Sequence, residues 1–116
     1  PLESAAQIQP YEKSLGYGST DVGDVSWATP TVGVRTATWV PGTSAHSWQA
    51  VAASGYSIGH KGAQQAAKAM ALMAAELFSN PELRQAARAE FDAARGEGYQ
   101  YRSLLGDRDP PLDYRK

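Results

Sequence analysis

Residues 30–41 read PTVGVRTATWVP, and this stretch carries the strongest strand pattern in the chain. β-Branched residues are dense within it and a proline bounds it on either side, a composition typical of a strand. In an extended chain, every second residue lies on the same face. Those positions here are Val32, Val34, Thr36, Thr38 and Val40. The segment therefore predicts a β-strand from Val32 to Val40.

Two helices are predicted downstream of this strand. From Ser57, which suits the N-cap position, to Phe78, apolar residues and alanines recur at three- and four-residue spacing. Asn80 and Pro81 form a second start signal, because asparagine caps a helix and proline fits its first turn. We expect the second helix to run to about Arg95 and to end at the glycine that follows.

The chain divides into three segments on this basis. Residues 1–29 are rich in glycine, serine, proline and aspartate, and they are predicted to form a loop with a short helical turn near residues 4–9. Residues 30–95 hold the strand, a long loop over residues 41–56 and the two helices. Residues 96–116, which include two consecutive prolines, are predicted to form an extended C-terminal tail.

A single strand cannot pair its own backbone groups, so the predicted strand needs a sheet supplied by a second copy or by protein outside this sequence. The chain also opens with Pro1 and a segment of little periodic pattern. This start fits either a trimmed, loose end or a chain that begins inside a larger protein. The predicted strand and the two predicted helices give an expected fold class of α/β.

Composition favours a soluble globular protein and argues against several functional classes. Hydrophobic residues make up 42% and charged residues 20% of the chain. The 11 basic and 12 acidic residues give no electrostatic footprint for nucleic acid or an anionic membrane. The absence of cysteine excludes disulfides and thiolate metal sites and fits a reducing, cytoplasmic compartment. No apolar run approaches the length of a membrane span.

The chain has two histidines. His46 follows the predicted strand, in a loop of small and hydroxyl residues next to Trp48, and no second His, Asp or Glu lies near it at a familiar metal spacing. His60 lies in the first turn of the first predicted helix. Taken alone, both histidines fit a surface role or a locally hydrogen-bonded role.

Asp21 and Asp24 lie three residues apart among glycines and hydroxyl residues in the segment GSTDVGDVSW, residues 18–27. The segment superficially resembles a calcium loop, but it lacks the EF-hand spacing and the terminal glutamate. The residue types alone favour an Asx-turn loop, in which each aspartate caps nearby backbone amides.

Three strings in this order point to a known family: GSTDVGDVSWATPT at 18–31, TATWVPGTSAHSWQAVA at 36–52 and SIGHKGAQQAAKAMA at 57–71. They resemble the amidohydrolase branch of the aminoacylase and carboxypeptidase metallopeptidases, and most closely the aminobenzoyl-glutamate hydrolase B-subunit type. The resemblance is close over residues 18–76 and loose in the proline-rich tail.

The resemblance implies the C-terminal part of a three-layer, zinc-peptidase-like catalytic domain with a mixed sheet. In the complete enzyme it implies two divalent metal ions, manganese or zinc, with the other ligands and a glutamate general base upstream of this chain. It also implies a homodimer formed through a lid domain that this chain lacks. His46 matches the last metal ligand of the family pattern. The site-supporting residues assigned from the resemblance are Ser19, Asp21, Asp24, Trp48 and His60. For His60, which matches an HKG pattern of the family, packing at the start of the helix is preferred to a role in catalysis.

The implied reaction is metal-assisted hydrolysis of the amide bond of an N-acyl amino acid such as aminobenzoyl-glutamate. Trp27 and Trp48 could line an aromatic subsite for such a small-molecule substrate, although packing in a core or interface is the preferred interpretation. The chain alone is expected to be inactive and to bind no metal ion, because a lone imidazole cannot hold two metal ions or activate their bridging water. The expected partner of this chain is the missing N-terminal part of the same protein. The alternative is a non-catalytic binding or assembly module that retains the peptidase scaffold.

Overall fold

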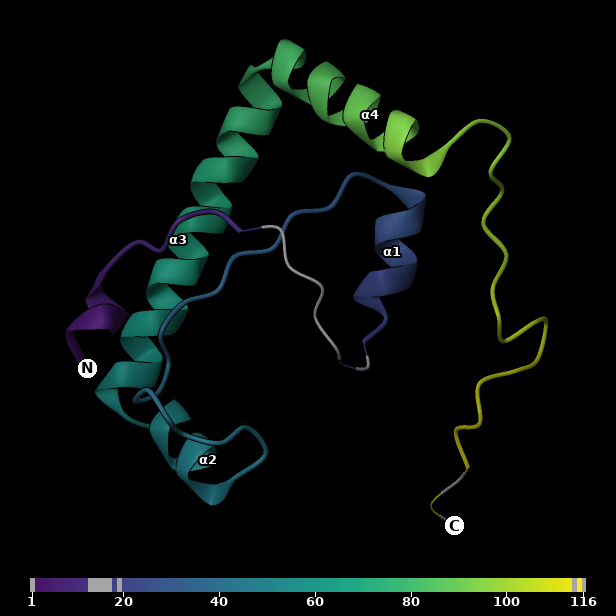
Figure 1. Cartoon of the computed structure of the whole chain (residues 1–116). Helices are drawn as coiled ribbons and strands as arrows, with labels where there is room; N and C mark the ends of the chain where they lie inside the picture. The colour runs from purple at the N-terminus through teal and green to yellow at the C-terminus, as the bar shows by residue number, and fades with distance from the viewer. Residues whose placement is uncertain (1, 13–17, 19, 114, 116) are drawn as a thin grey trace. The chain divides into compact units, whose positions relative to one another are not determined.

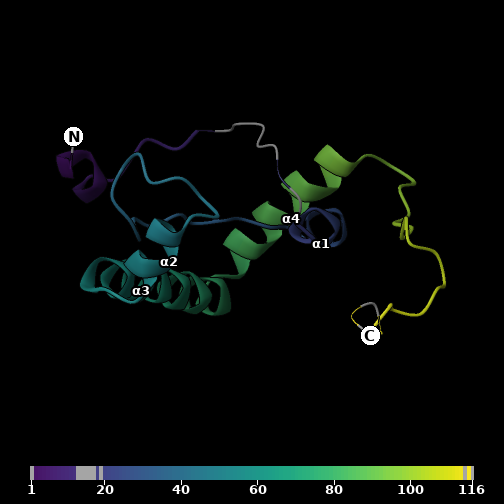
Figure 2. The same cartoon turned by 90° about the horizontal axis from the view of Figure 1, so that it is seen from below.

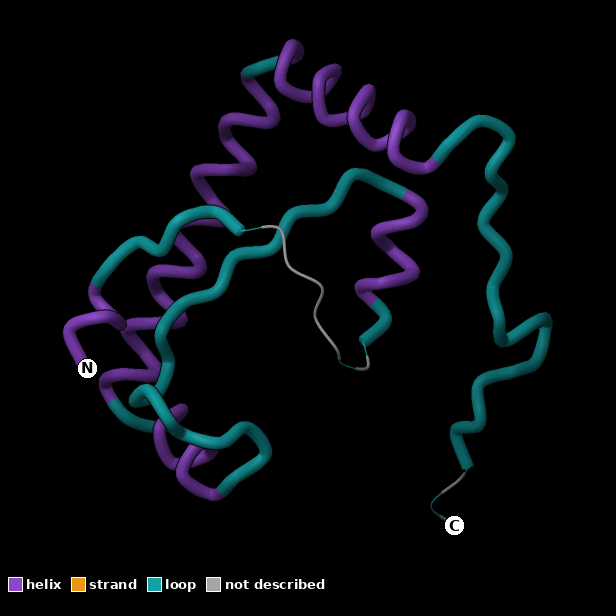
Figure 3. Tube along the Cα trace, viewed as in Figure 1, coloured by secondary structure: helices purple, strands orange, loops and turns teal. Residues whose placement is uncertain are grey.

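The computed structural model describes residues 2–12, 18, 20–113 and 115. Within these ranges all regular structure is helical (Figure 1, Figure 3). The elements are the 3-10 helix η1 (Leu2–Ala6) and the α-helices α1 (Val22–Ala28), α2 (Trp48–Ser54), α3 (Ser57–Ser79) and α4 (Pro81–Arg95).

The chain forms two compact units. The first comprises residues 1–17 and 32–84, and it contains η1, α2, α3 and the first turn of α4. The second comprises residues 18–31 and 85–116, and it contains α1 and the rest of α4.

The predicted α/β fold is wrong. The described residues contain no strand, and residues 31–40 form an irregular segment that lies almost entirely in the first unit. β-Branched residues favour an extended backbone, but a strand exists only when a neighbouring strand takes up its backbone hydrogen bonds. The described residues supply no such neighbour, so the composition of this segment did not decide its structure.

The segment that was predicted as a strand packs against α3 through a glycine. A Cβ at Gly62 would lie 2.2 Å from the carbonyl oxygen of Ala37 and 2.7 Å from the methyl group of Thr38. Only a residue without a side chain allows this approach. Thr36 and Thr38 are half-buried, whereas Val32 is 65% exposed.

Helix α2 packs against the start of α3, and the two lie side by side in both views (Figure 1, Figure 2). Ala50 is buried in α2, and a Cβ at Gly59 of α3 would lie 2.4 Å from the carbonyl oxygen of Ala53. The N-cap residue of α3 is Tyr56 and not the predicted Ser57, which is the first helical residue. Small residues therefore allow the close contact between these two helices.

The two predicted long helices are confirmed, and so is the junction between them. The side-chain oxygen of Asn80 accepts a hydrogen bond from the amide of Leu83 at 3.0 Å, which caps α4 as its sequence predicts. The Asn80 side-chain amide donates to Glu76 at 3.0 Å. The Arg84 guanidinium donates to the carbonyl groups of Leu77 and Phe78, so two backbone acceptors at the end of α3 have partners.

The short helices were not predicted. Helix α1 lies in the segment 1–29 that was assigned as loop, and α2 lies in the predicted loop 41–56. The expected N-terminal turn is present, but it covers Leu2–Ala6 and not residues 4–9. Helices of seven residues show too little periodicity to be recognised, and in water they depend on contacts with other elements.

The described residues bury almost no hydrophobic core. Ala50 is the only buried hydrophobic residue among them. Large apolar side chains are left open to solvent, including Trp48 at 75%, Phe78 at 87% and Leu104 at 99%.

Candidate functional site

His46 lies in a tight turn directly before α2. Its φ is 57°, and it is the only non-glycine residue with positive φ in the described part of the chain. The side chain is exposed. A left-handed backbone is uncommon for histidine and persists where neighbouring contacts fix it. Backbone conformations of this kind cluster at binding and catalytic sites.

Ser47 supplies the contacts that fix this turn. Its hydroxyl donates to the carbonyl oxygen of Ser44 at 2.6 Å and accepts from the amide of Ala50 at 3.2 Å. The second bond is the N-cap of α2, so the backbone on the C-terminal side of His46 is tied to the first turn of that helix. The imidazole is therefore presented to solvent from a fixed turn. Trp48, the first residue of α2, is exposed beside it in sequence.

Within the described residues, no group of three or more His, Cys, Asp or Glu side chains could hold a metal ion. The side chain of His46 can supply one imidazole ligand and no more.

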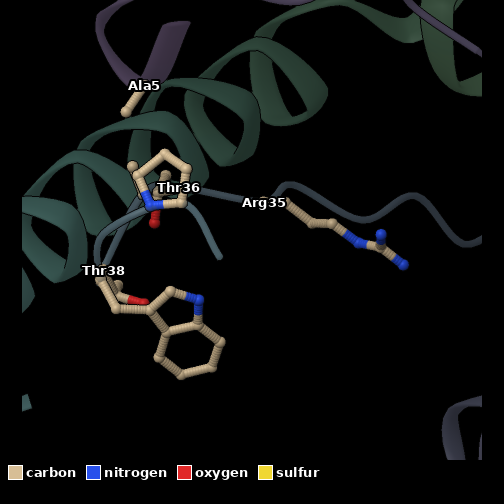
Figure 4. A pocket seen from close by; sticks show the side chains of 7 residues that line it. Ala5, Arg35, Thr36 and Thr38 are labelled. Carbon is tan, nitrogen blue, oxygen red and sulfur yellow. The ribbon is translucent and has the colours of Figure 1, made fainter. Parts of the chain in front are cut away.

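Two open depressions lie in the first unit, and neither adds a catalytic group. One, of about 380 Å³, is lined by Ala5, Pro41 and the segment 35–39, and the Arg35 side chain extends away from it (Figure 4). The other, of about 430 Å³, is lined by Gln49 and the segment 41–44. Neither lining includes a carboxylate or an imidazole.

Asp21 and Asp24 lie in the second unit, at the start of α1 and in its first turn. Asp21 holds the N-cap position, but its side chain makes no capping hydrogen bond. The hydroxyl of Thr20 accepts from the amide of Val22 at 3.3 Å instead. The carboxylate of Asp24 accepts a hydrogen bond from the hydroxyl of Tyr101 at 3.0 Å. Neither aspartate therefore has the local capping role that an Asx-turn loop would give it.

Tyr101 was not singled out from the sequence, because its partner is 77 residues away. The hydrogen bond to the Asp24 carboxylate raises the pKa of the Tyr101 phenol above its ordinary value of 10.0. Burial and the negative charge of Asp24 act in the same direction. The sequence signal for this contact was the pair Tyr99 and Tyr101 in the predicted tail. Aromatic residues at alternate positions often indicate a segment that packs against another part of the protein.

Of the other predicted residues, His60 lies in the first unit and Trp27 in the second. His60 is exposed in the first turns of α3, between the two packed positions Gly59 and Gly62. Trp27 of α1 stacks on Tyr99, with ring centroids 4.9 Å apart and ring planes at 25°. Ser19 lies outside the described residues. His46 belongs to the first unit, whereas Asp21 and Asp24 belong to the second.

Comparison with known proteins shows that part of a hydrolase is similar to this chain in sequence. No family model matches the chain, and no solved structure matches it. The B-subunit of p-aminobenzoyl-glutamate hydrolase from Escherichia coli (strain K12) is 39% identical over 88 residues, which is 74% of this chain. The chain spans only 18% of the length of that relative. The match confirms the resemblance to this type of hydrolase, and the chain is related in sequence to a part of it. In the described part of the chain, no helix is long and apolar enough to cross a membrane.

Proposed function

We propose that this relative of a part of the p-aminobenzoyl-glutamate hydrolase B-subunit works as one part of an amide-cleaving hydrolase. Its substrate would be an N-acyl amino acid such as aminobenzoyl-glutamate. The observation that carries the proposal is the 39% identity over 88 residues to that hydrolase. The fixed turn that presents His46 to solvent is consistent with this proposal, because a site residue must be held in one direction.

The proposed role of His46 is to donate one neutral imidazole to a metal ion. The complete hydrolase would hold two divalent ions, manganese or zinc, which would polarise the amide and lower the pKa of a water molecule. Their other ligands and the general base would come from outside the described residues, because these hold no further group of ligands. The contribution of this chain is to hold the imidazole at the start of α2.

The proposed partner is the remainder of the hydrolase, most of which has no counterpart in this chain. Two features support this. The described residues bury almost no core, and large apolar side chains such as Trp48 and Phe78 lie open to solvent. We expect the chain alone to be inactive. The proposal includes that the complete hydrolase is a homodimer and lies in the cytoplasm.

An exchange of segments tests the proposed function. The aligned segment of the Escherichia coli hydrolase would be replaced by this chain, and release of p-aminobenzoate and glutamate would be measured with manganese or zinc present. We expect the hybrid protein to cleave p-aminobenzoyl-glutamate and a chelator to abolish the cleavage. A hybrid that is folded but inactive would favour a binding or assembly module that has lost the chemistry.

A further inference from the structure

Helix α1 is too short to be stable by itself. It has seven residues, no side-chain capping bond at its N-terminus and no buried residue. Isolated helices shorter than about 12 residues are marginal in water. Contacts with another segment of the second unit must therefore keep α1 folded.

Two contacts join α1 to the segment that follows α4. Trp27 stacks on Tyr99, and the carboxylate of Asp24 accepts the hydrogen bond from Tyr101. Asp24 and Trp27 are three residues apart, so both lie on one face of α1. The stacking on Tyr99 and the hydrogen bond from Tyr101 therefore contact the same face of α1.

The end of α4 also contacts Tyr99. The guanidinium of Arg95 lies 4.9 Å from the centroid of the Phe91 ring and 5.9 Å from that of Tyr99. Asp92 pairs with Arg95 at 3.2 Å. The Nε of Arg95 is buried and has no hydrogen-bond partner among the described residues, while the same guanidinium pairs with Asp92 and lies over both aromatic rings.

The backbone between α4 and Tyr99 turns at two glycines. Gly96 and Gly98 have φ of 83° and 74°, which glycine adopts without strain. The amide of Gly96 donates to the carbonyl oxygen of Asp92 at 3.1 Å and ends the helix. The two glycines therefore turn the chain within a few residues.

We propose that Tyr99 and Tyr101 form a clamp that orders α1 and fixes the carboxylate of Asp24. The clamp consists of the stacked pair Trp27 and Tyr99, the supporting Arg95 and the hydrogen bond between Tyr101 and Asp24. In the proposed clamp, residues 99–101 stabilise α1 within the second unit and do not form a free tail. A role for the fixed carboxylate in hydrolysis rests on the proposed function, whereas the clamp itself does not.

Amide hydrogen exchange of the full chain tests the clamp. The reporters are the amides of Val25 and Thr29, which donate to the carbonyl groups of Asp21 and Val25. Tyr99→Ala should accelerate their exchange by about tenfold or more and leave the amides of α3 unchanged. Tyr99→Phe keeps the ring and should restore protection. Tyr101→Phe removes only the hydrogen bond and should give a smaller acceleration.

A matched control is Tyr11→Ala, which removes an exposed tyrosine of the first unit and should leave α1 unchanged. Equal exchange of the α1 amides in the original chain and in Tyr99→Ala would overturn the proposal. So would Tyr99→Phe behaving like Tyr99→Ala. Because exchange is measured without substrate or metal, this result is independent of whether the hybrid hydrolase is active.

Discussion

At the scale of single residues, the hydrogen bond between Tyr101 and Asp24 makes a prediction about pH. The neutral phenol donates to the carboxylate, and for this reason the pKa of Tyr101 lies above 10.0. The stability that this hydrogen bond gives to α1 is therefore fully present below pH 10.0, the ordinary pKa of a phenol. That stability is lost as the pH rises through the raised pKa of Tyr101. Asp24, Tyr99 and Ser103 are the groups that act on Tyr101. We expect α1 to lose protection in this alkaline range.

The measurement for this prediction is exchange of the α1 amides, corrected for intrinsic base catalysis, along a titration from neutral pH to above pH 10.0. Tyr101→Phe serves as the control, since it has no phenol to ionise and should lack the alkaline step. An identical step in the Tyr101→Phe variant would show that another group is responsible.

At the scale of elements, the close approach between α3 and the segment 36–38 depends on Gly62. A Cβ there would meet the backbone carbonyl of Ala37, which cannot move aside as a flexible side chain would. We expect Gly62→Ala to destabilise the first unit by about 1–3 kcal/mol, measured by exchange of α3 amides. Gly23→Ala is the matched control, because no atom lies within 4 Å of its Cβ position. That change should stabilise α1 by about 0.5–1 kcal/mol. Equal losses in both variants would contradict this explanation.

The elements also show which features were predictable. Helices α3 and α4 were found because their signals are local: apolar spacing, and the cap at Asn80 followed by proline. Helices α1 and α2 were missed because seven residues carry little pattern and their stability comes from contacts. The strand over residues 32–40 was wrong because a strand is a property of a pair, and the described residues provide no partner.

At the scale of the whole molecule, the sequence predicted the resemblance to this type of hydrolase, whereas the site residues assigned from that resemblance stay a prediction. The strings around Asp24, His46 and His60 carry the resemblance that the hydrolase match confirms. Spacing alone could not supply a metal site, because ligands in such sites come together only in the folded protein, and the described residues hold no group of them. Tyr101 was missed for a related reason, since its contact with Asp24 spans 77 residues.

The most direct test of the central claim is the change of His46→Ala in the hybrid hydrolase, read out as cleavage of p-aminobenzoyl-glutamate and as metal content. If His46 donates an imidazole to a metal ion, cleavage should fall by about a hundredfold or more and bound metal should decrease. His60→Ala, at the other histidine, should leave cleavage within about threefold. A His46→Ala hybrid that keeps its activity and its metal would contradict the account.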